Sequence, residues 1–564
     1  MQLSASQRSA HHGREAPRTG TRGRVSIAAA VIVGSLALSA CGSSQSGSQQ
    51  ASATTQAPQS GGALTYAVDK TQLTLDPAVS AQSVTALIDR NIFDSLVVQT
   101  GPSSFGPWLA TRWTTSPDGK TYTFHLRRGV TFHDGTPFTA AAVKASLDHV
   151  VDPKTASQYA ASLLPTYEGS KVIAPDQVQI RLSAPFRPLL QALSTAYLGI
   201  QSPKALALPV GKYAPVGTGP FKYGSWVNKK NVTLNRAASY ASAPSNAKHT
   251  GAAYLDRLNF QLISEDQTRY GALTSNQVQG IAAVPPSDVA SLKSSSSAQV
   301  LSVPQPGNSY SLYFQVKSGP LADVRVRKAL SAAIDVKTLI KTVYFGQFPA
   351  ATNPLGPTTA YHDASAGQEL QGFDLATAKR LLDEAGWTTV NSSGYRTKDG
   401  KQLTVEWPTL AVNESASDNT LGQGIVANAK AAGIDLRRPS LDVGAYIDAV
   451  KKTKYSVIDA GGGRADPDIL RFLYGAKQTF LTGGGNTSLV ASPQLDGWLN
   501  DGLVSSEPTK LAADYSAAQK YILSNAFQLP LHDNVSIAGF SKTVKGVASD
   551  VSGYPLFYSA WLDD

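Results

Sequence analysis

Residues 113–138 read WTTSPDGKTYTFHLRRGVTFHDGTPF, and the interpretation of the whole chain starts from this stretch. Tyr and Phe alternate with Thr over residues 121–126, a pattern typical of a half-buried strand. The Pro-Asp-Gly sequence at residues 117–119 suits a tight turn, because its Gly tolerates a positive φ. The stretch therefore predicts a β-hairpin whose two strands are residues 113–115 and 121–126.

Further strands and helices are predicted on both sides of this hairpin. Residues 64–68 alternate as a strand, and residues 86–97 follow as a helical stretch. Downstream, strands and helices alternate over residues 403–458, an order typical of an α/β lobe with a largely buried sheet. The strands expected there are 403–407, 435–436 and 455–458, and the helices are 424–432 and 445–451.

Two other segments have an unusually clear apolar stripe. In residues 323–334 the apolar side chains recur at helical spacing, while the basic ones fall on the opposite face. In residues 374–386 the stripe lies between Asp374, which suits a helix N-cap, and Gly386, which suits a left-handed stop. Both segments are predicted to be packing helices.

The net charge of +10 comes partly from the N-terminus. The chain has 564 residues, with 50 Lys and Arg against 40 Asp and Glu. Five Arg and one Glu precede residue 41, so this region accounts for +4 and the remainder for +6. Spread over the rest of the chain, such a surplus produces only a weak field, and we expect no nucleic-acid partner.

The N-terminus has the pattern of an export signal. Residues 1–24 are polar and Arg-rich, residues 25–38 are apolar, and small residues follow. The sequence Leu-Ser-Ala-Cys-Gly at residues 38–42 resembles the lipobox of bacterial lipoproteins, in which the signal is removed before a Cys that then carries lipid. The chain is thus predicted to have a lipoprotein signal peptide over residues 1–40 and a lipid attached to Cys41.

Two other interpretations of this region stay open, a short membrane anchor and an ordinary signal with an incidental Cys. Two or three acyl chains would hold a lipoprotein durably on a membrane, since each buried methylene contributes about 0.8 kcal/mol. Residues 41–62 are rich in Ser, Gln and Gly and carry no charge. We expect them to form a flexible tether that links an extracytoplasmic protein to the cell membrane.

The sequence lacks the motifs of the common hydrolases and nucleotide-binding enzymes. It has no G-x-S-x-G elbow, no H-E-x-x-H zinc motif and no G-x-x-x-x-G-K-[ST] phosphate loop. The eight His lack paired metal spacing, and the one Cys excludes an internal disulfide and a Cys-based metal cage. His133 and Asp134 are interpreted as part of a turn. We therefore expect no catalytic residue, no metal site and no cofactor.

Four stretches together resemble a known family. Residues 113–138 are similar to the signature of family 5 solute-binding proteins of ABC importers, the peptide and nickel class. The turn GTGPF at residues 217–221, the helix DVRVRKALSAAID at 323–335 and the segment AKRLLDEAGW at 378–387 resemble further motifs of this family. They occur in the family's order, and the resemblance covers residues 61–564.

The resemblance implies an α/β, two-lobed periplasmic-binding-protein-like fold with an extra subdomain and a hinge between the lobes. The ligand would lie in the cleft between the lobes, and the chain would cross between them near residues 302–305 and 530–534. The implied division is residues 63–105, 215–302 and 532–564 for lobe I, residues 106–214 for its extra subdomain, and residues 303–531 for lobe II.

The resemblance also points to a difference at the expected ligand site. Peptide-binding relatives carry a Trp at the position of Val443, and a Gly-Trp at the position of Gly461-Gly462, followed by an Asp that binds the α-ammonium group of the peptide. This chain has Arg464 in that region, and the acidic group is expected to be missing. A short free peptide held as in those relatives would then bury an ammonium group without a partner, which is costly.

Arg464 has two interpretations. Its guanidinium would offer a planar fork to a carboxylate or phosphate of the ligand, or it would form a structural ion pair with Asp466 or Asp468. The candidate ligand-binding residues are Tyr313, Gln315, Val443, Tyr446, Gly462, Gly463, Arg464 and Asp466.

The expected function is that of a lipid-anchored substrate-binding protein, which delivers a solute to the permease and ATPase subunits of an ABC importer. An oligopeptide is the leading ligand, and an oligosaccharide or a metal chelate such as a siderophore is the alternative. A ligand-sensing receptor of the same fold stays open as well, whereas a hydrolase lacks a visible catalytic constellation. The protein is expected to act as a monomer.

Overall fold

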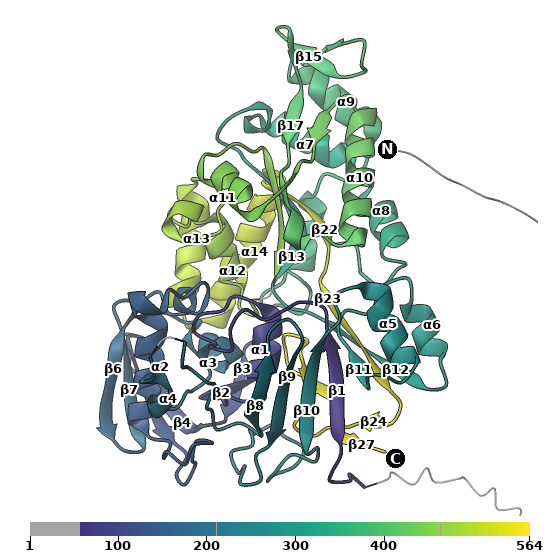
Figure 1. The fold of residues 1–564 in the computed structure, drawn as a ribbon. Coiled ribbons are helices and arrows are strands. Elements are labelled where there is room, and N and C mark those ends of the chain that lie inside the picture. Colours follow the sequence, from purple (N-terminus) through teal and green to yellow (C-terminus); the bar gives the residue numbers. More distant parts are fainter. Residues whose placement is uncertain (1–56, 210, 463, 564) are drawn as a thin grey trace, which may run out of the picture. The chain divides into compact units, whose positions relative to one another are not determined.

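The computed structural model describes residues 57–563 except for residues 210 and 463 (Figure 1). The predicted signal peptide, Cys41 and the first part of the predicted tether lie outside the described residues. Residues 57–564 form one unit by their internal contacts. Its largest sheet has seven strands, and a four-stranded sheet, two three-stranded sheets and several two-stranded pairs accompany it among the described residues.

The seven-stranded sheet belongs to lobe I and is mixed. β1 (Ala63–Val68) runs parallel to β10 (Arg257–Leu262) and to β11 (Gly280–Ile281), whereas the other neighbours pair antiparallel. The remaining strands are β8 (Phe221–Val227), β9 (Asn231–Arg236), β12 (Ala298–Pro304) and β23 (Val535–Ser541).

One face of this seven-stranded sheet packs on α5 (Asp266–Thr274) and α6 (Val289–Ser294). A cluster of aromatic rings, which includes Tyr66 and Phe540, packs on the other.

The helix predicted over residues 86–97 is wrong in its second half. α1 (Ser83–Asp89) ends at Asp89, and β2 (Val97–Gly101) begins where the helix was expected to end. The backbone in between bonds to a distant turn, because Gly219 N donates to Ile92 O at 2.8 Å and Phe221 N to Asn91 O at 3.0 Å. These carbonyls are therefore used to join β8 to the segment after α1.

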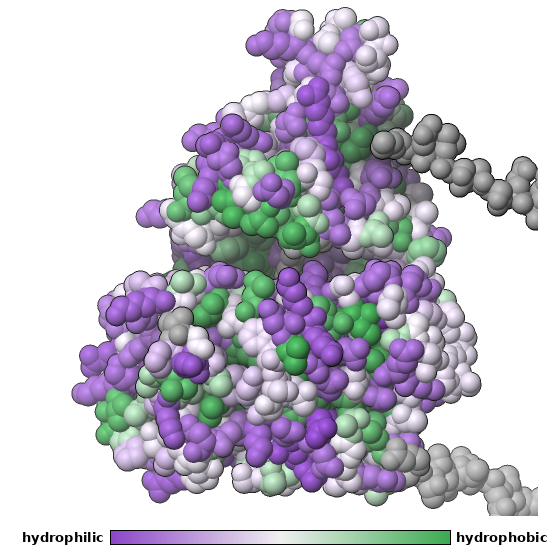
Figure 2. Space-filling model, in the orientation of Figure 1, coloured by the Kyte–Doolittle hydropathy of each residue, from purple (hydrophilic) through white to green (hydrophobic). Residues whose placement is uncertain are grey.

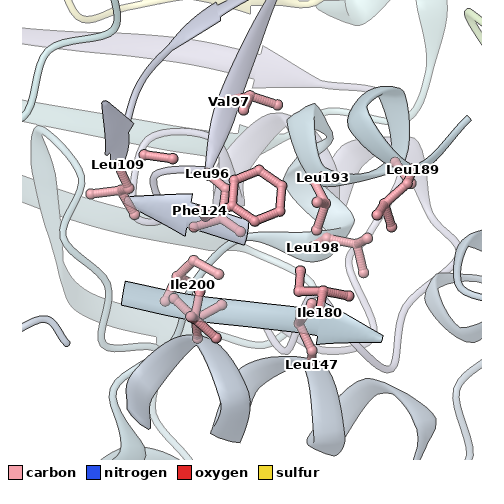
Figure 3. Packing of buried hydrophobic residues seen from close by; sticks show 14 of the residues in the cluster. Leu96, Val97, Leu109, Phe124, Leu147, Ile180, Leu189, Leu193, Leu198 and Ile200 are labelled. Carbon is pink, nitrogen blue, oxygen red and sulfur yellow. The ribbon is translucent and has the colours of Figure 1, made fainter. Parts of the chain in front are cut away.

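The extra subdomain is built on the predicted hairpin. β4 (Ala110–Thr115) and β5 (Thr121–Leu126) pair antiparallel, which confirms that prediction, and β7 (Gln177–Leu182) and β6 (Tyr167–Ala174) extend the sheet. Figure 3 shows Phe124 of β5 and Ile180 of β7 packing with Leu147 of α2 (Ala140–Val151) and Leu193 of α3 (Leu189–Ser194). Both helices thus cover the sheet through one apolar core.

Lobe II contains a three-stranded antiparallel sheet. β13 (Asn308–Phe314) lies between β21 (Val457–Gly462) and β22 (Gln528–His532). All five residues of β22 are buried, as are six of the seven in β13. The strands predicted over residues 403–458 do not form one sheet, because β21 joins β13 and the other two pair only with each other. A short parallel pair, β17 (Thr404–Glu406) and β19 (Asp435–Arg437), is joined through α10 (Ala416–Ala431).

The predicted helices of lobe II are confirmed, with one difference in length. α7 (Val324–Ala333) and α9 (Leu375–Glu384) match the two striped segments, and Asp374 caps α9 by accepting hydrogen bonds from two backbone amides. α10 begins about two turns earlier than predicted, because Ser415 and Asp418 form a capping box at its start. The other helices are α8 (Val336–Val343), α11 (Val443–Lys451), α12 (Ile469–Tyr474), α13 (Pro493–Val504) and α14 (Pro508–Ser524).

The chain passes between the two lobes at two adjacent segments. β12 of lobe I is followed by β13 of lobe II, and β22 of lobe II is followed by β23 of lobe I. Gln305 N donates to Asn534 O at 2.9 Å, and Asn534 Nδ2 donates to Asn308 O at 3.0 Å. The two connecting segments are therefore held together where they leave the sheets, while the predicted domain limits themselves stay a prediction.

Candidate functional site

A cavity of about 1050 Å³ is lined by residues of lobe I, of the extra subdomain and of lobe II. Its lining residues come from parts of the chain that are far apart in sequence, such as Arg90, Tyr159, Gly462 and Tyr554. Figure 2 shows a recess between the upper part of the molecule, which is lobe II, and the lower part. A cavity of this size between lobes is the place where a small-molecule site is expected.

Arg464 of lobe II lines this cavity and is 7% exposed. Its guanidinium lies over the ring of Phe472 at 4.5 Å and over the ring of Tyr159 at 5.5 Å. Arg464 Nη2 donates a hydrogen bond of 2.8 Å to Ser162 Oγ of the extra subdomain. The side chain is thus held by aromatic and hydroxyl groups on both sides of the cavity.

Neither of the two carboxylates predicted as alternative partners of Arg464 forms an ion pair with it. Asp466 pairs with Arg187 at 2.9 Å, and Asp468 pairs with Arg471 at 2.7 Å. Among the residues that the structure describes, no carboxylate oxygen lies within ion-pair distance of the Arg464 guanidinium. The predicted structural bridge is therefore absent from this part of the chain.

A second arginine of the cavity is balanced by its surroundings. Arg90, which follows α1, donates to Ser95 Oγ at 2.9 Å and to Ser194 O at 2.6 Å, and it lies over the ring of Trp108 at 5.0 Å. Burial lowers the pKa of Arg90, and the carboxylate of Asp550 counteracts this shift. Burial likewise raises the pKa of Asp550, and Arg90 opposes it. The two opposite charges therefore stabilise each other.

Tyrosine rings form a wall between these two charged regions. The rings of Tyr159 and Tyr197 meet edge to face with centroids 4.8 Å apart. Burial raises the pKa of the Tyr197 hydroxyl, and the neighbouring Tyr554 raises it further. Tyr554 N donates to Asp550 Oδ1 at 2.9 Å. Tyrosine side chains thus lie between Arg464 and Asp550, and aromatic rings of this kind can cover a flat or apolar part of a ligand.

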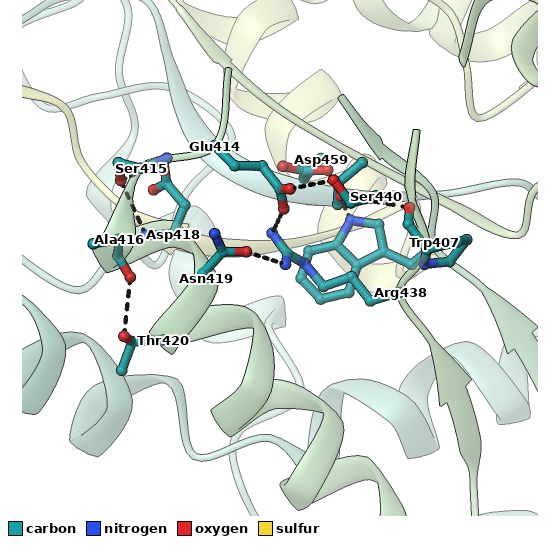
Figure 4. Close-up of polar contacts among 12 residues, drawn as sticks. Trp407, Glu414, Ser415, Ala416, Asp418, Asn419, Thr420, Arg438, Ser440 and Asp459 are labelled. Carbon is teal, nitrogen blue, oxygen red and sulfur yellow. Dashed lines mark hydrogen bonds and ion pairs between the residues drawn. The ribbon is translucent and has the colours of Figure 1, made fainter. Parts of the chain in front are cut away.

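Strand β21 of lobe II forms part of the cavity wall, and hydrogen bonds to its Asp459 side chain hold it in place. Asp459 of β21 accepts a hydrogen bond from Trp407 Nε1 at 2.7 Å and another from the Tyr310 hydroxyl. Figure 4 shows Arg438 over the indole ring of Trp407, with its guanidinium reaching Glu414 at 2.6 Å. This network holds the strand that ends in Gly461 and Gly462 at the cavity wall.

Two of the predicted ligand-binding residues, Gly462 and Arg464, line the cavity. A Cβ atom added to Gly462 would meet no atom within 4 Å, so its backbone faces open space. Asp466 is close by in sequence, but its carboxylate is taken up by Arg187 of the extra subdomain. Gly463 lies outside the described residues.

The other predicted residues lie away from the cavity. Tyr313 is 1% exposed, and its hydroxyl accepts a hydrogen bond from Asn308 Nδ2 at 2.9 Å. Gln315 is buried and accepts hydrogen bonds from the amides of Lys317 and Ser318. The structure places both of them in the sheet packing of lobe II.

Val443 and Tyr446 belong to α11. Val443 is 48% exposed, and Figure 2 shows hydrophobic side chains gathered on the surface over this helix. Tyr446 packs against a small cluster formed by Val450, Tyr455 and Ile458. Neither side chain is among those that line the cavity.

Several cavity residues were missed by the sequence interpretation. They come from the segment around α1, from the extra subdomain and from the C-terminal segment, and they are Arg90, Trp108, Tyr159, Tyr197, Asp550 and Tyr554. The abundance of Tyr, with 22 in the chain, was the only signal that pointed to them. Their positions depend on long-range packing, which a single sequence does not reveal.

The described residues were searched for metal-binding clusters of side chains and for helices that could span a membrane. Within residues 57–563, apart from the two gaps, no cluster of three or more His, Cys, Asp or Glu is placed to hold a metal ion. No helix in the same range is long and apolar enough to cross a membrane.

The chain is similar in sequence to the proteins of one known family. Residues 104–481 match the family model described as bacterial extracellular solute-binding proteins, family 5, middle. The glutathione-binding protein GsiB of Shigella dysenteriae is 27% identical over 489 residues, which cover 85% of this chain and 90% of that protein.

Two solved structures are also similar. NikA from Brucella suis in complex with Fe(III)-EDTA has a TM-score of 0.78 and 25% identity, and the match covers 89% of this chain and 100% of NikA. The periplasmic binding protein DppA from Helicobacter pylori, in complex with the peptide STSA, has a TM-score of 0.74 and 25% identity, with 90% and 99% covered. These structures confirm the predicted two-lobed α/β fold.

Proposed function

The chain belongs to family 5 of the bacterial extracellular solute-binding proteins, and from this premise we propose that it captures a solute for an ABC importer. Proteins of this family act outside the cytoplasm and bind solutes rather than transform them. The single observation that carries the proposal is the cavity of about 1050 Å³, which is lined from both lobes and from the extra subdomain. A ligand there would contact both lobes at once, and closure around it would present one conformation to the permease.

An oligopeptide is the proposed ligand, and a glycan or a metal chelate remains the alternative. The relative GsiB is named for glutathione, and the similar DppA structure holds a peptide, whereas the similar NikA structure holds Fe(III)-EDTA. The cavity supports a peptide of a few residues, because its walls combine tyrosine rings with amide side chains such as Gln191, Gln305 and Asn308.

We also propose that lipid on Cys41 tethers the protein to the outer face of the cell membrane, where it would meet its permease and ATPase as a monomer. The support is the lipobox-like sequence at residues 38–42 and the uncharged segment that follows it. Expression in a bacterial host with Cys41→Ser checks this part. The variant should leave the membrane fraction, whereas an unchanged distribution would contradict lipid anchoring.

The ligand is tested by native mass spectrometry of freshly purified protein, followed by thermal-shift screening. The probes are tripeptides, glutathione, maltotriose and Fe(III)-EDTA. A ligand at 100 times its dissociation constant should add about 2.7 kcal/mol to the free energy of unfolding. We expect the peptide probes to raise the melting temperature most. Chemical conversion of a probe by the protein would contradict a pure binding role.

A further inference from the structure

We propose that Arg464 binds a carboxylate of the captured solute, so that the protein selects acidic, carboxylate-bearing ligands such as peptides with a free C-terminus. This inference rests on the proposed function, because it names the substrate class of the same cavity. It starts from the position of Arg464, which is 7% exposed and lines the cavity.

Arg464 has no ion-pair partner among the described residues. A guanidinium removed from water is costly unless an anion and further hydrogen bonds compensate for it. The nearby carboxylates of Asp466 and Asp468 are each engaged by another arginine, at 2.9 Å and 2.7 Å. The one hydrogen bond that the structure records from the Arg464 side chain goes to the neutral hydroxyl of Ser162, at 2.8 Å. The charge of Arg464 still acts on Asp468, but the two groups form no ion pair, so a ligand carboxylate would supply the direct anionic partner of the guanidinium.

Aromatic rings and a hydroxyl group hold the guanidinium of Arg464 in one position. The rings of Phe472 and Tyr159 lie against it, at 4.5 Å and 5.5 Å from its central carbon. Such contacts are made with the faces of the aromatic rings and do not use up the N–H donors of the guanidinium. Nη2 is oriented by Ser162, whose own hydroxyl donates to Tyr159 O at 2.8 Å. The remaining donors of a fixed fork suit the two oxygens of a carboxylate.

The cavity wall carries a net positive charge. The charged lining residues are Lys70, Arg90, Arg464 and Asp550, which gives a formal charge of +2. Arg90 and Asp550 offset each other, as their pKa shifts show. The excess positive charge therefore lies with Lys70 and Arg464, and it favours an anionic ligand over a neutral one.

The contact also couples recognition to closure. Arg464 belongs to lobe II, whereas Tyr159 and Ser162 lie in and beside η2 (Ala160–Leu163) of the extra subdomain. The guanidinium has these partners only when lobe II and the extra subdomain are together. A carboxylate bound there would thus stabilise the closed arrangement through its tighter contacts in that state.

The experiment compares ligands that differ only in the acid group. Isothermal titration calorimetry is run with an equimolar pool of tripeptides carrying free C-termini, with the same pool amidated at the C-terminus, and with glutathione and maltotriose. The proteins are the wild type, Arg464→Gln, Arg464→Lys and the matched control Arg187→Gln. Arg187 is an arginine of the same interface that pairs with Asp466 and does not line the cavity.

The wild type should bind the free-acid pool at least about tenfold more tightly than the amidated pool, since a charged hydrogen-bond pair contributes about 1.5–3 kcal/mol. Arg464→Gln removes the contacts to Ser162 and Tyr159 for every ligand, but it should lower affinity for the acids at least about tenfold more than affinity for the amides. Arg464→Lys should recover part of the loss, whereas Arg187→Gln should weaken acids and amides alike. The melting temperature of each variant without ligand checks that the fold is intact.

The inference is overturned if acids and amides bind equally, or if Arg464→Gln weakens both pools to the same extent. Binding of the amides or of maltotriose without binding of the acids also overturns it, but leaves the proposed solute-binding function in place. Binding of none of the probes would contradict this inference and the proposed peptide ligand together.

Discussion

Arg187 of the extra subdomain and Asp466 of lobe II form an ion pair, with 2.9 Å between Arg187 Nη2 and Asp466 Oδ1. Arg187 Nε also donates to Gly502 O at 2.9 Å, and Arg187 N donates to Leu503 O at 2.8 Å. Burial alone would lower the pKa of Arg187, but Asp466 and Tyr515 raise it above its usual value. One arginine thus joins the extra subdomain to lobe II beside the cavity.

The first prediction concerns this ion pair. Arg187→Gln leaves the Asp466 carboxylate without its cation in the closed arrangement, whereas opening would return that carboxylate to water. The closed state should therefore be less populated, and affinity for any cavity ligand should fall about tenfold. Small-angle scattering with and without a tripeptide pool measures the closure. A radius of gyration and an affinity equal to those of the wild type would show that the pair does not control closure.

The second prediction uses Gly462 as a steric probe. A larger side chain at this position would enter open space next to the cavity, since a Cβ atom there would have no neighbour within 4 Å. Gly462→Leu should keep the melting temperature close to that of the wild type and should weaken peptide binding at least about tenfold by filling the site. Calorimetric titration with the tripeptide pool checks the affinity.

Gly461→Ala is the matched control for that experiment. Its Cβ would lie 2.9 Å from Tyr310 Cδ2 and 3.0 Å from Tyr310 Cα, so the neighbouring strand would have to shift. This variant should lose stability, by about 1–3 kcal/mol. If Gly462→Leu were destabilised as much as Gly461→Ala, its loss of binding would carry no information on the site.

The third prediction concerns the turn at residues 217–221. A Cβ on Gly217 would lie 2.0 Å from Ile92 O, and that backbone cannot move without breaking the junction between β8 and the segment after α1. Gly217→Ala should therefore lower the free energy of unfolding by about 3 kcal/mol or more. Gly497→Ala in α13, where a Cβ meets nothing within 4 Å, should instead stabilise by about 0.5–1 kcal/mol. Urea denaturation measures both, and equal midpoints would contradict the close approach.

The fourth prediction concerns His532 at the end of β22. Burial lowers the pKa of this residue from 6.5 to about 4, although the Asp533 carbonyl and Asp418 oppose the shift. The rings of Tyr310, Tyr344 and Phe348 surround it. The unfolded chain takes up a proton below about pH 6.5, whereas the folded chain does so only below about pH 4. Stability from this group is therefore lost as the pH falls between these values, by about 3 kcal/mol in total.

The measurement is the difference between the wild type and His532→Phe in denaturant unfolding from pH 7 to pH 4. A difference is needed because Asp94, whose pKa burial raises to about 6, works in the opposite direction: its folded form binds a proton first, so it adds stability as the pH falls. Asp94 is present in both proteins and cancels. Curves that stay parallel over this range would contradict the assigned shift of His532.

Elements whose sequence pattern lies within one short stretch were predicted correctly. The hairpin of β4 and β5 follows from alternation and a turn, and α9 from an apolar stripe with a cap at Asp374. The sequence interpretation failed where a distant segment decides the structure. Residues 92–96 have apolar side chains at helical spacing, yet the carbonyls of Asn91 and Ile92 accept hydrogen bonds from Phe221 and Gly219, and α1 stops at Asp89.

The candidate site likewise combines residues that the sequence pointed to and residues that only long-range packing brings there. Gly462 and Arg464 were found because a family motif covers that segment, whereas Tyr313 and Gln315, equally near a motif, point into the lobe II core. Tyr159 and Tyr554 had no local signal at all. Their side chains reach the cavity only because η2 and the C-terminal segment are folded against α1 and β21.

By itself, then, the sequence determined the periodic elements, the order of the family motifs and the presence of Arg464 where the resemblance leads us to expect an acidic residue, since each of these depends on a short stretch. Only the tertiary structure decided which of three arginines lines the cavity without a carboxylate in ion-pair distance among the described residues. Arg187, Arg471 and Arg464 look alike in sequence, but the first two face Asp466 and Asp468 and the third faces the cavity. The physical reason is that ion pairing depends on distances of a few ångströms between segments that the chain order does not relate.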